Sequence, residues 1–381
     1  MESKRDVERF LDSWKLGRLS RRDFKRGLAS VGLGMTVAPL SSRLVRAAGE
    51  DDPTCFTWSG YEVPEMHQEY IDKYGESPNF SMWGDEEEAE AKMRAGFQPD
   101  VAMPCSYKVQ KWTDFGFLQA IDTSRLSHWG DVIPVLQAVP DMIVDGNQMM
   151  VCAWWGLTSV TFRTDLAPEY VPEETHTWGI LWDEKYAGRL SMIDSLIDGV
   201  MVAAIYSGAK DPFDMTSEEV EKVRQLMEEQ RPLLRYYTND TTSWEQALAS
   251  GELIAAASWN STPLNLTNEG SPVMFMNPTE GPMTWTCGIT LMSFADPAKV
   301  DRAYDLIDAF HAPSTGHFWV ETYGMGHSNN KTYKGFSADE LVARGMQPDD
   351  VEGYIASGIF QATIQNEPEL QAMYEEVKAG M

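Results

Sequence analysis

Short apolar runs alternate with helical patterns along most of this chain, and this alternation constrains the fold more than any other feature of the sequence. Strand-like runs bounded by turn residues include "CFTW", "NFSMW", "DVAMP", "MMVCAWW" and "TSVTFRT". Between and after them lie helical patterns at 64–74, 85–95 and 107–113, followed by the amphipathic segments "SEEVEKVRQLMEEQRPLL", "DPAKVDRAYDLIDAFH" and "EPELQAMYEEVKAG". Alternating β and α elements predict an α/β protein with largely parallel sheets.

The chain of 381 residues is long enough for two domains. Because no flexible linker divides it, we expect two α/β domains that are joined by crossovers and enclose a ligand cleft. Ligands of open α/β sheets bind beyond the carboxyl ends of the strands. The segments "TWSGY" and "MPCSY" would both lie there, so Trp58, Tyr61, Ser106 and Tyr107 are expected to face one cleft.

The N-terminal segment carries an export signal rather than part of the fold. Arg21 and Arg22 lie in an S-R-R-x-F pattern, which precedes a weakly apolar stretch at 27–40 and small residues at Ala47 and Ala48. These features are typical of a twin-arginine signal peptide, so residues 1–47 are expected to be removed and the protein to reach the periplasm. The alternative is a basic amphipathic helix of a cytoplasmic protein.

The formal net charge is −27, and it becomes about −33 without residues 1–47, which hold 11 Lys and Arg against 5 Asp and Glu. Such a charge argues against nucleic acid or an anionic membrane surface as a partner. It suits either the attraction of cations or a surface adapted to high salt. The acidic run "GDEEEAEAK" at 84–92 is expected to be a solvated helix start.

Neither a metal site nor a cofactor site is expected. The four cysteines (Cys55, Cys105, Cys152 and Cys287) form no C-x-x-C pair, and the six histidines form no zinc motif. The chain after the leader holds no G-x-G-x-x-G, no haem motif and no G-x-S-x-G. An exported enzyme is therefore the remote alternative to a binding protein.

Six segments, in order, resemble motifs of the spermidine/putrescine-binding proteins of bacterial ABC importers, which are type II periplasmic solute-binding proteins. They are "TWSGYEVPEM", "FQPDVAMPCSYKVQKWTDFGFLQAID", "WWGLTSVTFRTD", "THTWGILWDEKYAGRLSMID", "ASGELIAAASWN" and "GPMTWTCGITLM". The resemblance covers essentially the whole chain after residue 47. It implies a monomeric receptor that captures a polyamine or a related organic cation and delivers it to an ABC permease in the inner membrane.

The resemblance also implies domain boundaries and a ligand site. The first domain would comprise 48–157 plus 283–325, and the second 158–282 plus 326–381. Aromatic faces attract ammonium groups and cover methylene groups, while a carboxylate fixes a charged end of the ligand. The expected ligand-binding residues are Trp58, Ser59, Tyr61, Ser106, Tyr107, Asp198, Trp259, Trp285 and Cys287.

The sequence departs from the family pattern at two carboxylates, which Ser195 and Cys287 replace, so that Asp198 is the one matched anion. Each buried ammonium group needs a partner. These departures therefore predict weak binding of spermidine, better binding of a ligand with one cationic end, and a gain in polyamine affinity from Cys287→Asp. An unrecognised acid in the cleft would overturn this expectation, and the candidates are Glu62, Asp194 and Glu280.

Two further questions stay open in the sequence. Cys287 is either a free buried thiol or the partner of Cys105 in a disulfide that a shared cleft would permit. The ligand could also be a betaine or an amino-acid derivative. Arginines such as Arg163 and Arg189 facing the cleft would favour that second ligand class, because carboxylates need donors.

Overall fold

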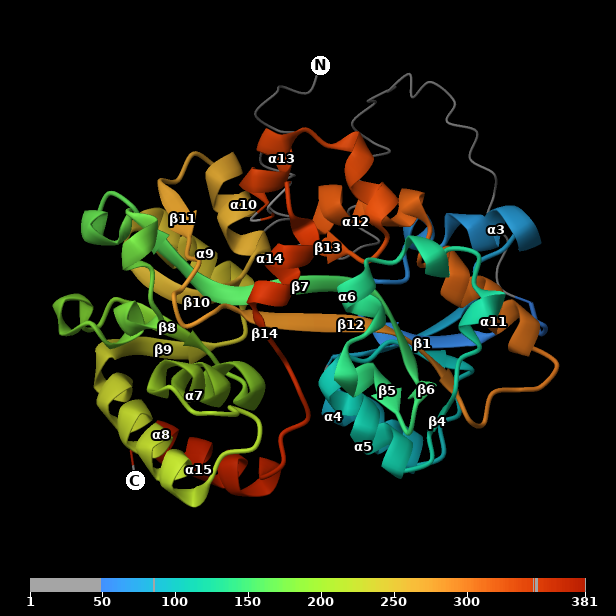
Figure 1. The fold of residues 1–381 in the computed structure, drawn as a ribbon, viewed down its shortest axis with the longest axis horizontal. Coiled ribbons are helices and arrows are strands. Elements are labelled where there is room, and N and C mark those ends of the chain that lie inside the picture. The colour runs from blue at the N-terminus through green and yellow to red at the C-terminus, as the bar shows by residue number, and fades with distance from the viewer. Residues whose placement is uncertain (1–48, 85, 345, 347–348, 381) are drawn as a thin grey trace, which may run out of the picture. The chain divides into compact units, whose positions relative to one another are not determined.

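The computed structural model describes residues 49–84, 86–344, 346 and 349–380, which all belong to one compact unit. The predicted signal peptide, with its paired arginines, lies outside the described residues. Two hydrophobic cores divide the unit into two lobes (Figure 1). The first core gathers buried side chains from Cys55 to Leu157 and from Trp285 to Ile355, and the second gathers them from Val160 to Met283 and from Leu370 to Val377.

Most strands of the described residues form one sheet that runs through both lobes in the order β2-β1-β3-β12-β7-β10-β8-β9. The strands are β1 (Thr54–Trp58), β2 (Asn79–Trp83), β3 (Val101–Ala102), β4 (Leu118–Gln119), β5 (Ile143–Val144), β6 (Asn147–Gln148), β7 (Met150–Arg163), β8 (Leu190–Ile193), β9 (Leu234–Thr238), β10 (Ala255–Trp259), β11 (Val273–Phe275), β12 (Met283–Met292), β13 (Gly326–His327) and β14 (Ile359–Phe360).

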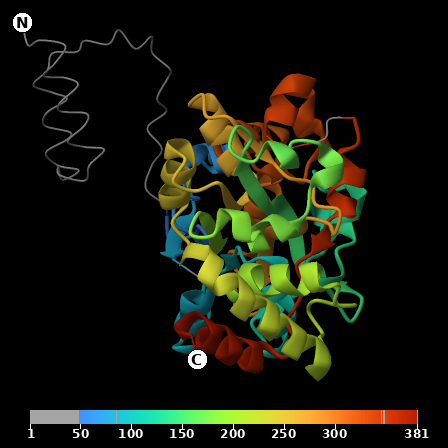
Figure 2. The ribbon, with the colours of Figure 1, turned by 90° about the vertical axis from the view of Figure 1, so that its left-hand side faces the viewer.

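Helices cover the sheet in each lobe. They are α3 (Gln68–Tyr74), α4 (Glu86–Arg94), α5 (Val109–Asp114), α6 (Pro134–Gln137), α7 (Met201–Ser207), α8 (Ser217–Gln230), α9 (Thr241–Ser250), α10 (Ser261–Asn268), α11 (Val300–Ala309), α12 (Pro313–Tyr323), α13 (Ala338–Ala343), α14 (Val351–Ser357) and α15 (Glu367–Ala379). The C-terminal helix α15 packs beside α8 on the second lobe, as Figures 1 and 2 show.

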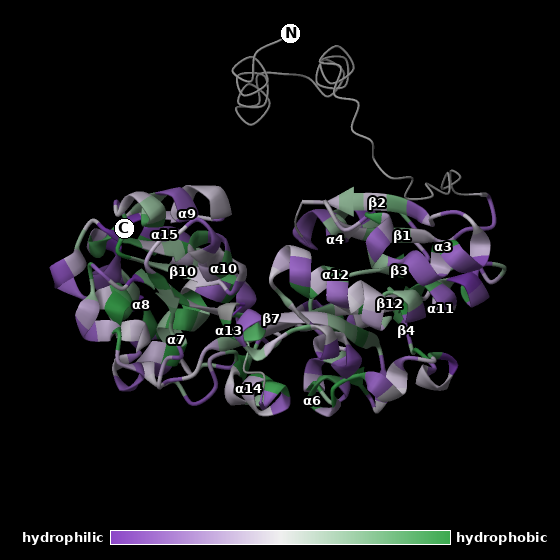
Figure 3. Ribbon diagram, turned by 90° about the horizontal axis from the view of Figure 1, so that it is seen from above, coloured by the Kyte–Doolittle hydropathy of each residue, from purple (hydrophilic) through white to green (hydrophobic). Residues whose placement is uncertain are grey.

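The expectation of largely parallel sheets holds for the outer strands of each lobe and is wrong for the centre. Strands β1, β2 and β3 pair in parallel, as do β8, β9 and β10. The central strands β7 and β12 instead pair antiparallel with each other, and β7 also runs antiparallel to β10. Figure 3 shows β7 between the helices of the two lobes.

The central strands are long because each of them serves both cores. The runs "MMVCAWW" and "TSVTFRT" form the single strand β7, whose residues are buried up to Phe162. Its first half packs in the first core, and Val160 and Phe162 pack in the second. Strand β12 is also buried along its whole length. Since apolar residues then occupy both faces, the continuous hydrophobic pattern of these segments has a direct structural cause.

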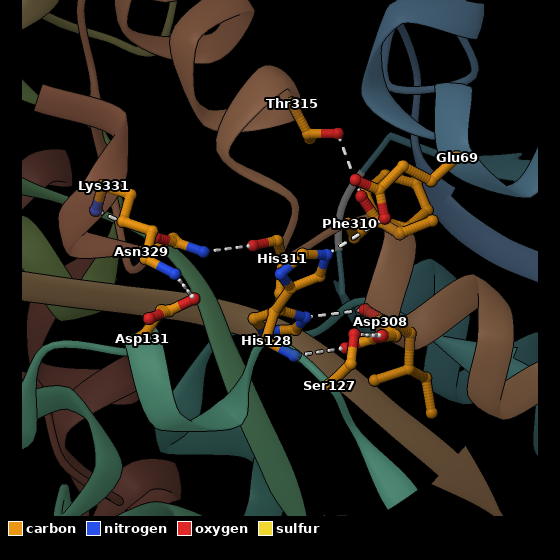
Figure 4. Close-up of polar contacts among 12 residues, drawn as sticks. Glu69, Ser127, His128, Asp131, Asp308, Phe310, His311, Thr315, Asn329 and Lys331 are labelled. Carbon is orange, nitrogen blue, oxygen red and sulfur yellow. Dashed lines mark hydrogen bonds and ion pairs between the residues drawn. The ribbon is translucent and has the colours of Figure 1, made fainter. Parts of the chain in front are cut away.

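The segment 327–331, which follows α12, forms polar contacts with the first lobe (Figure 4). His327 Nε2 bonds to the carbonyl oxygen of Phe310 at 3.0 Å, and Asn329 Nδ2 donates to the carbonyl oxygen of His311 at 2.8 Å. Lys331 pairs with Asp131 at 2.7 Å. Further along the chain, the side chains of Leu341, Met346 and Ile355 join the first core, although 326–381 was expected to belong to the second domain.

Candidate ligand-binding site

A cavity of about 640 Å³ lies where the two lobes face each other. Both lobes and the segment 363–378 form its walls. The lining residues are Trp58, Gly84, Glu86, Glu87, Tyr107, Lys108, Lys111, Ile193, Asp194, Ser195, Leu196, Ile197, Asp198, Asn239, Trp259, Thr363, Ile364, Glu367, Gln371, Tyr374, Glu375 and Lys378.

The first lobe contributes two aromatic side chains from the ends of strands. Trp58 ends β1, and its Nε1 donates to the carbonyl oxygen of Met103 at 3.0 Å, which fixes the ring plane. Tyr107 lies in the 3-10 turn Ser106–Lys108 that follows β3, and its hydroxyl donates to Glu86 Oε2 at 2.5 Å. Burial, followed by the negative charge of Glu86, raises the pKa of Tyr107 well above its usual value, so the phenol remains a neutral donor.

The second lobe contributes Asp198 and Trp259. Asp198 lies in the π turn Leu196–Val200 ahead of α7, where Oδ1 accepts from Thr158 Oγ1 at 2.9 Å and Oδ2 accepts from Ser195 Oγ at 2.8 Å. Burial raises the pKa of Asp198, and these two hydroxyl donors oppose the rise. Trp259 ends β10 and packs edge-on against Trp244 at 5.4 Å between ring centroids.

Four of the nine expected site residues thus line one cavity, namely Trp58, Tyr107, Asp198 and Trp259. The other five lie outside its walls. Tyr61 packs edge-on against Trp154 and Trp319. Ser59 is exposed beside the end of β2, since its backbone N–H donates to the carbonyl oxygen of Trp83.

Three of those five residues lie in or beside β12. Ser106 is buried and accepts from Thr286 Oγ1 at 3.0 Å. Trp285 is 8% exposed and its ring covers Gly156 of β7. Cys287 is bonded to Cys105, so the disulfide is the correct choice between the two states left open by the sequence. Its sulfur therefore cannot act as a thiolate partner for a ligand cation.

The sequence interpretation missed Glu86. The acidic run at 84–92 was expected to be solvated, but this is wrong for Glu86, whose exposed fraction is 2%. Its carboxylate accepts from the backbone N–H of Cys105 at 2.6 Å and from the hydroxyl of Tyr107. Glu86 begins α4, the helix that follows β2, and this position near a strand end, like that of Trp58 at the end of β1, is the signal that could have identified it.

The other acids named as candidates have different surroundings. Asp194 lines the cavity and pairs with Lys378 at 2.8 Å. Glu62 accepts from the backbone N–H of Gly60 at 2.8 Å, and Glu280 accepts from the hydroxyl of Thr177. Neither Glu62 nor Glu280 is part of the cavity wall.

No arginine lines the cavity among the described residues. Arg163 pairs with Asp165 at 2.8 Å and donates to the carbonyl oxygen of Leu248, and Arg189 donates to that of Gly251. The cations in the wall are Lys108, Lys111 and Lys378, and each of them pairs with glutamate or aspartate.

Within the part of the chain that the structure describes, histidine, cysteine and carboxylate side chains do not gather in any group of three or more that could hold a metal ion. No helix in that part is both long and apolar enough to cross a bilayer.

Comparison with known proteins identifies relatives of this chain. The spermidine/putrescine-binding periplasmic protein of Salmonella typhimurium is 22% identical over 358 residues, which cover 92% of this chain and 96% of that protein. A putrescine/agmatine-binding protein of Pseudomonas aeruginosa is 24% identical over 278 residues, covering 68% of this chain and 73% of that protein. The resemblance inferred from the six motifs is therefore confirmed.

The fold is also shared with solved structures. The spermidine/putrescine ABC transporter substrate-binding protein of Streptococcus pneumoniae superposes with a TM-score of 0.72 at 15% identity, over 86% of this chain and 99% of that one. This likeness confirms the expected fold class, the two-domain α/β fold of type II periplasmic binding proteins. Residues 80–343 match the family described as "Bacterial extracellular solute-binding protein". The chain belongs to this family of extracytoplasmic solute-binding proteins.

Proposed function

We propose that this protein is the receptor of an ABC importer, and that it captures a polyamine such as putrescine or a related organic cation. The observation that carries this proposal is the composition of the cavity wall. Trp58, Tyr107 and Trp259 offer aromatic surface, while Glu86 and Asp198 are buried carboxylates without a salt-bridge partner among the described residues. Ammonium groups are attracted to aromatic faces, and methylene groups between them gain from apolar contact.

Capture would proceed by closure of the two lobes around the ligand. A ligand that contacts Trp58 and Tyr107 of the first lobe and Asp198 and Trp259 of the second binds the closed state better than an open one. Strands β7 and β12, which run through both cores, would carry the hinge. The permease of the inner membrane would then receive the ligand unchanged, so no catalytic residue is assigned and the enzyme alternative is set aside.

The proposed domains follow the expected boundaries with one amendment. The first would comprise 48–157 plus 283–325, and the second 158–282 plus the C-terminal part of the chain. Because the buried residues of α13 and α14 pack in the first core, we assign 326–355 to the first domain. The second domain would then end with α15, whose buried face packs in the second core.

The wall favours a cation over a betaine or an amino-acid derivative. A ligand carboxylate would need donors, but the three lysines of the wall are already paired with acids of the protein. A cation would instead meet an excess of acidic side chains, because the wall holds Glu86, Glu87, Asp194, Asp198, Glu367 and Glu375 against those lysines.

A panel of ligands tests this function. Selective binding to the folded state stabilises it by an amount that grows with the logarithm of ligand concentration over Kd, and so raises the melting temperature. Putrescine, agmatine, spermidine and other amines without a carboxylate should raise it, whereas γ-aminobutyrate, glycine betaine and dicarboxylates should not. If only the zwitterions raise the melting temperature, the ligand is a betaine or an amino-acid derivative and not an organic cation.

We propose further that the protein is exported by the twin-arginine pathway to the periplasm and acts there as a monomer that binds no nucleic acid. Arg21→Lys combined with Arg22→Lys should keep the precursor in the cytoplasm, because a receptor reads the paired arginines. Secretion of this double variant at the normal level would rule out that pathway.

A further inference from the structure

Glu86 is an unusual carboxylate for a run of acidic residues, because the fold turns it away from water. It begins α4, the side chain is 2% exposed, and it lines the cavity beside Tyr107. Both oxygens accept hydrogen bonds from the turn that follows β3, one from the Cys105 backbone N–H and one from the Tyr107 hydroxyl. These neutral donors orient the carboxylate without neutralising it.

The lysines of the cavity wall form salt bridges with all but two of the acidic side chains in that wall. Lys108 pairs with Glu87 at 2.7 Å and with Glu367 at 3.6 Å, and Lys111 pairs with Glu367 at 3.3 Å. At the other end, Lys378 pairs with Asp194 at 2.8 Å and with Glu375 at 3.0 Å. Every lysine of the wall is therefore engaged by other carboxylates.

The two acids that pair with no lysine in the described residues line the cavity from different lobes. Glu86 belongs to the first lobe and Asp198 to the second, and among the described residues neither forms a salt bridge. Asp198 is held by two hydroxyl groups, as Glu86 is held by a hydroxyl and a backbone N–H. The hydroxyl of Tyr107 is bonded to Glu86 and also lies within the electrostatic reach of Asp198. A buried charge without a counterion is unfavourable, so each site would gain from a cation.

We propose that Glu86 is a ligand-binding carboxylate, and that Glu86 and Asp198 together make the cavity specific for a linear diamine with one ammonium group at each lobe. This inference rests on the proposed function. The sequence had predicted that a ligand with one cationic end binds better than a polyamine, because Asp198 was the one carboxylate found at the motif positions. With Glu86 as a second carboxylate, a diamine should bind better. In this proposal Glu86 supplies the carboxylate that the motifs lack at Cys287, and one of its oxygens accepts from the backbone N–H of Cys105, the other half of the disulfide.

Diamine binding should release a proton near neutral pH. Burial raises the pKa of Glu86 to about 7, against the opposing effects of the Cys105 N–H, the Tyr107 hydroxyl and the positive charge of Lys108, while the charge of Glu87 adds to the rise. An ammonium group beside the carboxylate favours the ionised form. At pH 7 about half a proton per bound ligand should therefore leave Glu86, and the affinity for a diamine should fall as the pH falls below 7.

Isothermal titration of putrescine and of 1-aminobutane tests the inference, with wild type, Glu86→Gln and Glu88→Gln compared at pH 6, 7 and 8. The charged hydrogen bond lost in Glu86→Gln should weaken putrescine binding about 10- to 100-fold and leave 1-aminobutane binding nearly unchanged. Glu88→Gln is the matched control, because Glu88 belongs to the same helix but lies outside the cavity wall, where it pairs with Lys92. It should change neither affinity by more than a small factor.

The outcomes separate the inference from the proposed function. If no organic cation binds wild type, the proposed function fails. If putrescine binds wild type and Glu86→Gln equally, or if Glu86→Gln weakens both amines to the same extent, Glu86 only positions the Tyr107 turn and the inference is wrong. Proton release is measured on wild type alone, from the binding enthalpy in two buffers of different ionisation enthalpy at pH 7, so it needs no variant. Putrescine binding without proton release would also overturn the inference.

Discussion

The indole ring of Trp285 fills the space that a side chain at Gly156 would need. A Cβ atom placed on Gly156 would lie 2.0 Å from Trp285 Cζ2 and 2.6 Å from Asn260 Oδ1. Residues 156 and 285 are directly paired in the register of β7 and β12. Trp285 therefore packs against the strand that joins the two cores, at the proposed hinge and outside the cavity wall.

Gly156→Ala should destabilise the protein, because the added methyl group forces Trp285 or the strand out of position. Overpacking of this kind costs about 1–3 kcal/mol of unfolding free energy, which urea denaturation measures. Gly130→Ala is the control, since a Cβ there would meet no atom within 4 Å. An unchanged unfolding free energy in Gly156→Ala would show that Trp285 does not constrain the hinge as described.

Trp58→Ala should weaken diamine binding and leave the fold largely intact. A desolvated cation–π contact is worth about 1–2 kcal/mol, and Trp58 lines the cavity with its Nε1 anchored on Met103. The dissociation constant should rise by about 5- to 30-fold, whereas Trp58→Phe, which keeps an aromatic face, should lose less. Equal affinity of wild type and Trp58→Ala for putrescine would mean that this ring supports the core only.

The disulfide between Cys105 and Cys287 should contribute strongly to stability, because it joins residues 182 positions apart. Loss of such a link typically costs about 2–5 kcal/mol, so the double variant Cys105→Ala/Cys287→Ala should unfold at lower urea concentration. A reductant should shift wild type toward the same midpoint and leave the double variant unchanged. A wild type that does not respond to reduction would contradict the role of this bond.

The same bond changes the expectation for Cys287→Asp. From the motifs alone, that substitution restores a carboxylate and raises polyamine affinity. In the structure it would break the disulfide and place a second negative charge near the turn that holds Glu86. We therefore expect Cys287→Asp to lower the melting temperature, and a stable variant with higher putrescine affinity would speak against this reading of the site.

Stability should fall in mild acid because of His327. This ring is buried and neutral, with Nε2 bonded to the carbonyl oxygen of Phe310 and Nδ1 accepting from the Asn329 N–H. Burial lowers the pKa of His327 from 6.5 to about 3. A group whose pKa is lower in the folded state binds its proton more readily in the unfolded state, so its stabilising effect is present above pH 6.5 and decreases as the pH falls toward 3.

Urea denaturation of wild type and His327→Gln at pH 7 and pH 5 measures this effect. Between these values, wild type should lose about 2 kcal/mol more than the variant, because the variant has no ring to protonate. The raised pKa of Glu86 acts in the opposite direction but is common to both proteins. An equal loss in both would contradict the assignment to His327.

The sequence was a good guide to the fold wherever a local pattern decided the outcome. The expected helix at 85–95 is α4 (Glu86–Arg94), and the strands "CFTW" and "NFSMW" are β1 and β2. The course of β7 through both cores could not be read locally, because an apolar run around Gly156 fits two short buried strands as well as one long strand. Only the pairing with β12 decides between them.

Part of the candidate site could be predicted from local sequence patterns. Trp58, Tyr107 and Trp259 follow or end strands, and such positions converge at one edge of the sheet. Glu86 could not be recognised from the acidic run around it, because its burial comes from the turn at Cys105–Tyr107, which folds over the start of α4. A long-range contact of this kind has no counterpart in local charge patterning.

Whether the protein is a receptor for organic cations is best tested by the binding of putrescine to the purified protein at pH 8, measured by isothermal titration calorimetry. Saturable binding with one site per chain is expected. Asp198→Asn should lose about tenfold or more in affinity, because a charge-assisted hydrogen bond to the ammonium group is removed. If wild type produces no binding heat with putrescine, spermidine or agmatine at any temperature tried, while a zwitterion or an anion binds in the same cavity, the protein is not a receptor for organic cations.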